Sequence, residues 1–194
     1  ENADALYDAI SQKLAEPAFL PRALFDRFNI EVLATTEDPL DDLSHHQSIR
    51  SSGWTGRVIT TYRPDNVIDP EHTGFAQNVE RLGILTKCDT QNWQGYLQAH
   101  RLRRAYFRSF GATATDHGHP TARTENLSCE DAAALFDKVV RGQASPQEAE
   151  RFRGQMLTEM ARMSLEDGMV MQLHPGSWRN HSPTIFSAYG RDKG

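Results

Sequence analysis

The sequence predicts an α/β fold in which short parallel strands alternate with helices. Four short apolar runs, rich in β-branched residues, are spaced along the chain with helical stretches between them. Each connection is long enough for the crossover of about a dozen residues that joins parallel strands. This strand-then-helix order is typical of a parallel sheet covered by helices.

The first 62 residues predict three helices and two strands. Leu6, Ile10 and Leu14 stand at helical spacing before Pro17, and Pro21 is placed as in the first turn of a helix. The apolar run after Asn29 has the length and composition of a buried strand. The expected elements are helices over 3–15, 21–28 and 40–50, and strands over 30–36 and 57–62.

Helix boundary signals are clearer in the rest of the chain. Ser128 and Ser145 are candidate N-caps, the latter followed by a proline, and Gly111 and Gly168 are candidate helix ends. The expected elements are helices over 71–82, 93–110, 129–140 and 146–166, and strands over 112–117 and 169–174.

Composition excludes several classes of protein. The 194 residues predict a single α/β unit, and 21 basic against 26 acidic residues (net charge −5) exclude general binding to nucleic acid. No apolar run approaches the ~18 residues of a membrane span, and the start has no signal-peptide pattern. Cys88 and Cys129 lie far apart, which predicts neither a disulfide nor a zinc site. We expect a cytoplasmic protein without nucleic-acid or membrane partners.

Polar and reactive residues collect at the carboxyl ends of the four predicted strands. In parallel α/β folds these ends form the ligand site, and several strands contribute to it. In chain order the candidates are Thr36, Tyr62, Arg63, Asp65, Asp116, His117, His119, His174, Trp178 and Arg179.

Each of these candidates has an alternative reading. Arg63 offers a planar fork for a carboxylate or phosphate, or it pairs with Asp65 to fix the turn. Asp116 and His117 are a base with its orienting partner, or metal ligands, or Asp116 caps the following turn. His174 is a ligand-binding residue or a satisfied structural histidine.

Other conspicuous residues favour structural roles. His45 and His46 are expected in solvent or at an interface, and the arginines at 101, 103 and 104 on a solvated face or in ion pairs. Met156, Met160 and Met163 have the spacing of core residues. The absence of GxGxxG, P-loop, GxSxG and HExxH motifs argues against dinucleotide enzymes, Walker ATPases, serine hydrolases and zincins.

Taken in order, the strand ends resemble those of the uronate isomerase (glucuronate isomerase) family. The matching runs cover nearly the whole chain in the family's order: FNIEVLATTEDPLDD (28–42), YRPD (62–65), ATDHG (114–118) and MQLHPGSWRN (171–180). The resemblance implies a (β/α)8 TIM-type barrel of the amidohydrolase superfamily, of which this chain is the central part, about half. It also implies interconversion of D-glucuronate with D-fructuronate, and of D-galacturonate with D-tagaturonate, through a cis-enediol.

The resemblance implies roles for particular residues. Asp116, His117 and His174 are the candidates for proton transfer or hydroxyl binding, and Arg63 for binding the C6 carboxylate. The substrate-binding candidates with Arg63 are Tyr62, Asp65, Thr36, Trp178 and Arg179. The family holds a divalent metal, zinc in our expectation, through an HxH on the first strand and an Asp on the last. Neither segment is seen here, so no metal ligand is predicted within this chain.

Two further readings remain open. The enzymatic alternative is a metal-assisted hydrolysis or decarboxylation, and the non-catalytic one is a fragment or sugar-acid binding module that keeps Arg63. A half barrel leaves unpaired strand edges and an open inner face. We therefore expect the chain to form a homo-oligomer or to be part of a longer chain.

Overall fold

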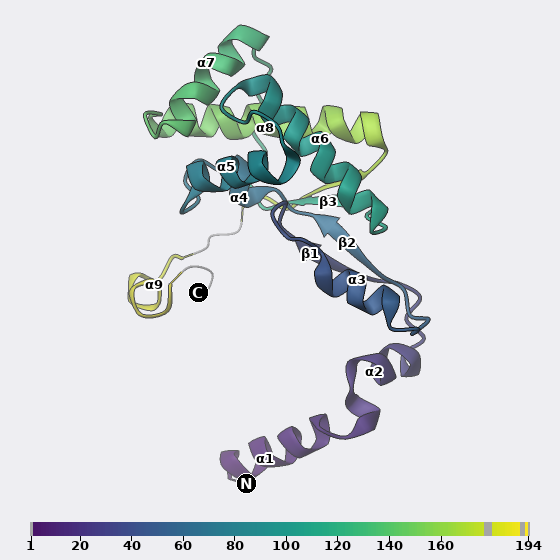
Figure 1. Cartoon of the computed structure of the whole chain (residues 1–194). Coiled ribbons are helices and arrows are strands. Elements are labelled where there is room, and N and C mark those ends of the chain that lie inside the picture. The colour runs from purple at the N-terminus through teal and green to yellow at the C-terminus, as the bar shows by residue number, and fades with distance from the viewer. Residues whose placement is uncertain (1, 177–179, 191–192, 194) are drawn as a thin grey trace. The chain divides into compact units, whose positions relative to one another are not determined.

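The computed structural model describes residues 2–176, 180–190 and 193, and the contacts among them divide the chain into two units (Figure 1). The N-terminal unit comprises Glu1–Thr35 and Leu43–Thr60, and the main unit comprises Thr36–Asp42 and Thr61–Gly194. Two strands, β1 (Leu33–Glu37) and β2 (Val58–Tyr62), begin in the N-terminal unit and end in the main unit. The carboxyl ends that matter for a site therefore lie in the main unit.

The N-terminal unit confirms the first two expected helices. Its elements, besides the starts of β1 and β2, are α1 (Ala3–Leu14), the 3-10 turn η1 (Pro17–Phe19), α2 (Pro21–Arg27) and α3 (Ser44–Ser51). The third helix begins four residues later than expected, because Leu43 adopts the left-handed conformation (φ 56°) that an α-helix cannot contain.

Two burial predictions fail in the N-terminal unit. The first strand is not buried, since Leu33 is 41% exposed and β1 is the edge strand of the sheet. The solvent position, one of two alternatives for His46, is wrong, since His46 is only 6% exposed and its Nε2 hydrogen-bonds the Thr35 hydroxyl at 2.9 Å. His45, its neighbour, is exposed as expected.

The main unit carries the rest of the sheet, whose strand order is β1-β2-β3-β4. β2 pairs in parallel with β3 through Tyr62 and Thr115, and β3 pairs in parallel with β4, where Asp116 lies opposite Gln172. The predicted parallel α/β class is thus confirmed. The remaining elements are α4 (Asp65–Ile68), α5 (Phe75–Thr86), α6 (Trp93–Ser109), β3 (Ala114–His117), α7 (Cys129–Val140), α8 (Pro146–Asp167), β4 (Val170–Leu173) and α9 (Pro183–Tyr189).

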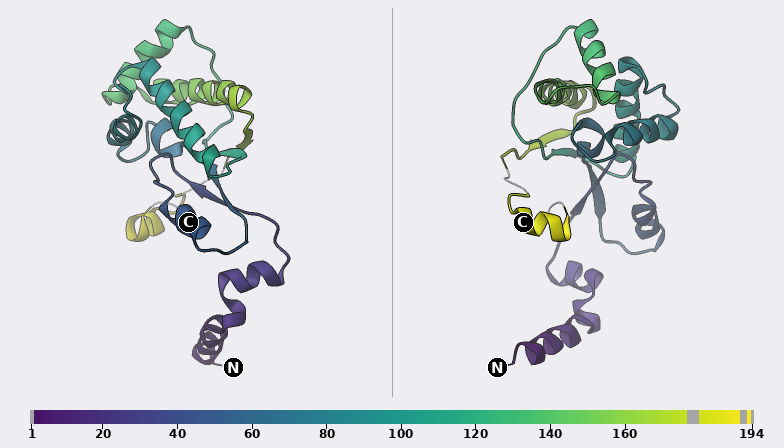
Figure 2. Two further views of the ribbon diagram at one scale, coloured as in Figure 1. Left: turned by 45° about the vertical axis from the view of Figure 1, so that its right-hand side comes forward. Right: turned by 90° about the vertical axis from the view of Figure 1, so that its left-hand side faces the viewer.

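Helices α5 to α8 gather on one side of β3 and β4 in Figure 1 and in both views of Figure 2. Their shared core is aromatic, with Tyr96 stacked on Phe136 at a centroid distance of 4.6 Å. The prediction that Met156, Met160 and Met163 are core residues is confirmed, since all three are at most 1% exposed. No helix in the described part of the chain combines the length and apolarity that crossing a membrane requires.

Two of the three arginines singled out on α6, Arg103 and Arg104, do not lie on a solvated face. Arg103 is 8% exposed and Arg104 is 1% exposed, and Arg104 forms an ion pair with Asp167 at 2.6 Å. The alternative prediction, an ion-pair network, is the one that the structure confirms for Arg101 and Arg104.

Candidate active site

Side chains from three consecutive strand ends meet at the carboxyl edge of the sheet. Arg63 follows β2, Asp116 lies in β3, and His174 follows β4, where its N–H donates to the His117 carbonyl and extends the ladder. Arg63 Nη1 donates to Asp116 Oδ2 at 3.2 Å, and His174 Nε2 lies 2.8 Å from Asp116 Oδ1. Asp116 therefore bridges a guanidinium and an imidazole.

Asp65, the first residue of α4, completes this group, which we call the strand-end cluster: Arg63, Asp65, Asp116 and His174. Asp65 Oδ2 accepts a hydrogen bond from Arg63 Nε at 2.8 Å, so Arg63 forms the turn-fixing ion pair that was one of its two predicted roles. The backbone N–H of Gly118 donates to Asp65 at 3.1 Å. The carboxylate that caps the turn after β3 is thus Asp65, and not Asp116 as one alternative held.

The pleat of β3 separates Asp116 from His117. Successive side chains of a strand point to opposite faces, and Thr115 and His117 are fully buried while Asp116 remains 15% exposed. The hypothesis that Asp116 and His117 form a base with its orienting partner is therefore wrong as a pairing. The imidazole that Asp116 holds is that of His174, which comes from the next strand.

Tyr62 and His117 lie in a buried polar layer instead of in the strand-end cluster. The Tyr62 hydroxyl hydrogen-bonds His100 Nδ1 at 2.8 Å, and His117 Nε2 hydrogen-bonds the Thr115 hydroxyl at 2.9 Å. Burial lowers the pKa of His100 to about 3 and that of His117 to about 3, and it raises the pKa of Tyr62. These shifts favour the neutral form of all three groups at neutral pH, which makes them poor candidates for proton transfer there.

Thr36 is a candidate that remains outside the strand-end cluster. Thr36 is exposed at the carboxyl end of β1, and none of the described contacts joins it to Arg63 or Asp116. Trp178 and Arg179 lie outside the described residues.

Gly118 belongs to the site although sequence reasoning did not select it. A Cβ atom at this position would come within 2.5 Å of Arg63 Nη2 and 2.8 Å of Asp65 Oδ2. An alanine at this position would require the ends of the Arg63 and Asp65 side chains to shift from the positions that they occupy. The sequence does contain one indication of this role: Gly118 directly follows a predicted strand and stands between Asp116-His117 and His119-Pro120.

Metal binding finds no support in the geometry of this part of the chain. Within residues 2–176 and 180–190, no group of three or more His, Cys, Asp and Glu side chains is arranged to hold an ion. His117 and His119, which have the HxH spacing, place their ring centroids 5.8 Å apart, and both are buried. Two histidines alone do not make a metal centre, and the described residues provide no third ligand beside them.

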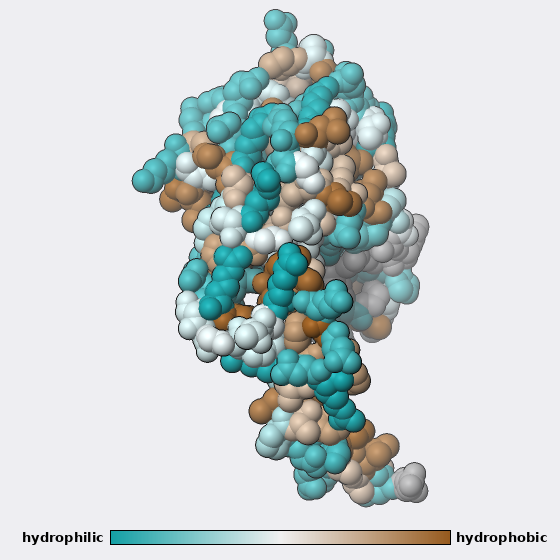
Figure 3. Space-filling model, turned by 90° about the vertical axis from the view of Figure 1, so that its right-hand side faces the viewer, coloured by the Kyte–Doolittle hydropathy of each residue, from teal (hydrophilic) through white to brown (hydrophobic). Residues whose placement is uncertain are grey.

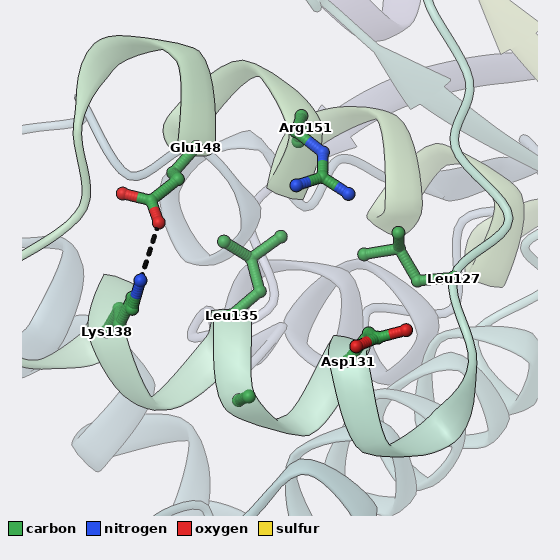
Figure 4. Close-up of a pocket in the computed structure, with 7 residues that line it drawn as sticks. Leu127, Asp131, Leu135, Lys138, Glu148 and Arg151 are labelled. Atoms are coloured by element: carbon green, nitrogen blue, oxygen red, sulfur yellow. Dashed lines mark hydrogen bonds and ion pairs between the residues drawn. The ribbon is translucent and has the colours of Figure 1, made fainter.

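A separate hollow of about 240 Å³ lies between α7 and α8 (Figure 4). Lys138 and Glu148 form an ion pair of 2.7 Å across it, and Asp131 accepts a hydrogen bond from Ser128. It contains no predicted site residue, and its charged groups have protein partners. The strand-end cluster is therefore the stronger candidate.

Comparison with known proteins gives one consistent result. The family model described as glucuronate isomerase matches residues 1–194. The uronate isomerases of Phenylobacterium zucineum and Xanthomonas campestris are each 62% identical to this chain over its whole length. The matched region makes up 40% of the first protein and 41% of the second. The crystal structure of glucuronate isomerase from Caulobacter crescentus matches the whole chain with a TM-score of 0.93 and 57% identity, over 40% of its own chain.

A more distant structure agrees. The uronate isomerase from Thermotoga maritima, at 26% identity, matches 99% of this chain with a TM-score of 0.89, over 42% of its own. The chain thus spans about 40% of the length of the relatives it matches. These neighbours are TIM-barrel-type proteins, and the four parallel strands with their helices correspond to part of such a barrel.

Proposed function

The chain belongs to the glucuronate isomerase family, and we propose that its strand-end cluster serves the isomerisation of a uronate. The proposed reaction converts D-glucuronate to D-fructuronate, and D-galacturonate to D-tagaturonate. A proton leaves C2 of the open-chain aldehyde, a cis-enediol forms, and a proton is returned to C1. Because the chain spans about 40% of its relatives, the proposal concerns the part of the site that these residues form.

The observation that carries this proposal is the bridge from Arg63 through Asp116 to His174. His174 Nε2 lies 2.8 Å from a carboxylate oxygen, which favours the tautomer with the proton on Nε2 because a carboxylate accepts a hydrogen bond. Nδ1 is then the basic nitrogen. His174 is 44% exposed, so a sugar could approach it. We propose that His174, oriented by Asp116, moves the proton between C2 and C1.

Arg63 is the cation of the strand-end cluster, and we propose that it binds the C6 carboxylate. A guanidinium recognises a carboxylate through parallel hydrogen bonds. Its ion pairs with Asp65 and Asp116 fix the plane of the group before a ligand arrives. Holding a flexible polyol at its charged end would place C2 and C1 reproducibly near the base.

The superfamily is metal-dependent, and we propose that any divalent ion, zinc in our expectation, is held by residues other than those described. When bound, such an ion would polarise a substrate oxygen. Tyr62 and His117, which are buried, are proposed to support the sheet and not to contact the sugar.

The test is proton NMR of D-glucuronate in D2O with the folded chain, with and without added zinc. We expect loss of the C2 proton signal and appearance of the ketose, and a rate lower by roughly 100-fold or more in Asp116→Asn. Asp137→Asn is the control, because Asp137 forms an exposed surface ion pair with Arg141.

Equal rates in the wild type and Asp116→Asn would contradict the assigned roles. If the folded wild type gives no exchange, the isomerase proposal for this chain fails. A titration with D-glucuronate, followed by chemical-shift changes, then tests the non-catalytic alternative of a sugar-acid binding module.

A further inference from the structure

We propose that Asp65 is a positioning residue that holds the Arg63 guanidinium and the turn after β3 in one arrangement, and that it does not itself bind substrate. The inference rests on the proposed function for the identity of the ligand, a uronate. It assigns Asp65 a role different from the substrate-binding role that its place at a strand end predicts.

The first argument is that one carboxylate joins two turns that are 53 residues apart in the chain. Asp65 Oδ2 accepts from Arg63 Nε at 2.8 Å, while Oδ1 and Oδ2 lie 3.1 and 3.2 Å from the Gly118 nitrogen. Arg63 follows β2 and Gly118 follows β3. Charge-assisted hydrogen bonds of this kind are short and directional, so the carboxylate fixes both turns together.

The second argument is the close packing around Gly118. A Cβ there would approach Arg63 Nη2 to 2.5 Å and Asp65 Oδ2 to 2.8 Å, distances that real Cβ atoms do not show. The turn after β3 therefore lies in close contact with the Arg63–Asp65 ion pair, and an added methyl group would displace the ends of both side chains.

The third argument is chemical. Both oxygens of Asp65 are already hydrogen-bonded to the protein, and its negative charge would repel the carboxylate of a uronate. Asp65 is therefore poorly suited to bind that substrate directly. Asp65 acts through Arg63: it accepts a hydrogen bond from Arg63 Nε. The Nη1 group of the same guanidinium donates to Asp116 at 3.2 Å.

The consequence concerns pre-organisation. A free arginine side chain has many rotamers, and ordering it on binding weakens the affinity for the ligand. With Asp65 in place, the guanidinium already has the orientation that a carboxylate would meet.

The test compares Asp65→Asn with the wild type in the full chain. Asparagine has nearly the same shape but carries no negative charge, so its hydrogen bonds to Arg63 Nε and Gly118 N are weaker than the charge-assisted bonds of the carboxylate. Two quantities are measured by heteronuclear NMR: the dissociation constant for D-glucuronate and the solvent exchange of the Arg63 Nε–H signal. We expect binding at least about 10-fold weaker and faster Nε–H exchange.

Two further variants complete the design. Asp69→Asn is the matched control: Asp69 is also partly buried and pairs with an arginine, Arg153, at 2.9 Å, and Arg153 keeps its ion pair with Glu150. We expect wild-type binding and wild-type Arg63 exchange for it. Gly118→Ala disturbs the same contacts from the β3 side and replaces Asp65→Asn if that variant does not fold.

Wild-type affinity in the folded Asp65→Asn and Gly118→Ala variants overturns the proposal. If the wild type itself does not bind D-glucuronate, the proposed function is at fault, and the Arg63 Nε–H signal alone decides the positioning role. Faster exchange in the variants than in Asp69→Asn then supports it, and unchanged exchange overturns it.

Discussion

The histidines behind the strand-end cluster are kept neutral by their surroundings. His100 and His117 are fully buried, and burial lowers the pKa of each to about 3. Each ring has one hydrogen-bond partner, Tyr62 and Thr115 respectively. An imidazole in the unfolded chain has a pKa of about 6.5, so the unfolded chain binds protons at a higher pH than the folded one.

This difference predicts that the free energy of unfolding decreases with acidity. Between about pH 6.5 and 3 the unfolded state binds more protons than the folded state. The contribution of the two neutral rings to the free energy of unfolding is therefore fully present above pH 6.5 and is lost as the pH falls below it. Each histidine should contribute roughly 1.4 kcal/mol per pH unit well below 6.5. Urea unfolding at pH 7.5, 6.5, 5.5 and 5.0 measures this slope.

A substitution separates the two histidines from other titrating groups. His117→Gln should reduce the slope by about the contribution of one proton, whereas His45→Gln, at an exposed position, is the control and should leave it unchanged. A free energy of unfolding that does not vary between pH 6.5 and 5.0 would contradict the assignment of neutral buried rings.

At the same scale, the sequence predicted which residues gather at the strand ends but not which of them meet. Arg63, Asp116 and His174 were all selected, because strand-end position can be inferred along one chain. The contact of Asp116 with His174 depends on pairing between β3 and β4, which local sequence does not encode. The separation of Asp116 from His117 could have been inferred, since neighbouring strand residues face opposite ways.

At the scale of elements, two ion pairs connect α6 with the end of α8. Arg101 pairs with Glu166 at 2.7 Å, and Arg104 pairs with Asp167 at 2.6 Å. They differ in burial, since the Arg101 and Glu166 side chains are 35% and 50% exposed while those of Arg104 and Asp167 are 1% and 16% exposed. The two pairs form a comparison within one helix–helix contact.

We expect Asp167→Asn to lower the free energy of unfolding by about 3 kcal/mol, because the buried Arg104 charge would lose its main partner. Glu166→Gln should cost less than about 1 kcal/mol, because water solvates the exposed Arg101. Urea unfolding at neutral pH measures both. Equal effects of the two substitutions would show that burial does not determine the contribution of these pairs.

The ends of α7 and α8 were predictable from the sequence, whereas α5 is found at Phe75–Thr86 instead of the expected 71–82. Ser128 and Ser145 cap α7 and α8 through hydrogen bonds to residues three positions later, and Gly168 ends α8 with φ 75°. These are local interactions, so the sequence shows them directly. The short helices α4 and α9 were missed because four and seven residues offer too little periodicity.

At the scale of the whole molecule, the distribution of apolar surface is uneven. Leu6, Ile10 and Leu14 on α1 are 58%, 51% and 58% exposed, and Figure 3 shows brown side chains along the N-terminal segment at the bottom of the view. Val170, on the edge strand β4, is 64% exposed. Contiguous exposed apolar side chains and open strand edges favour association with other protein surfaces.

We therefore expect the isolated chain to associate with itself as its concentration rises, and to increase the fluorescence of the dye ANS while folded. Analytical ultracentrifugation over a range of concentrations measures the association. The triple variant Leu6→Gln, Ile10→Gln, Leu14→Gln should reduce both signals, because it removes apolar surface from α1 without changing the net charge. Since all three side chains are exposed, its free energy of unfolding should stay within about 0.5 kcal/mol per site. A monomer at every concentration that leaves ANS dark would show that this apolar surface drives no association.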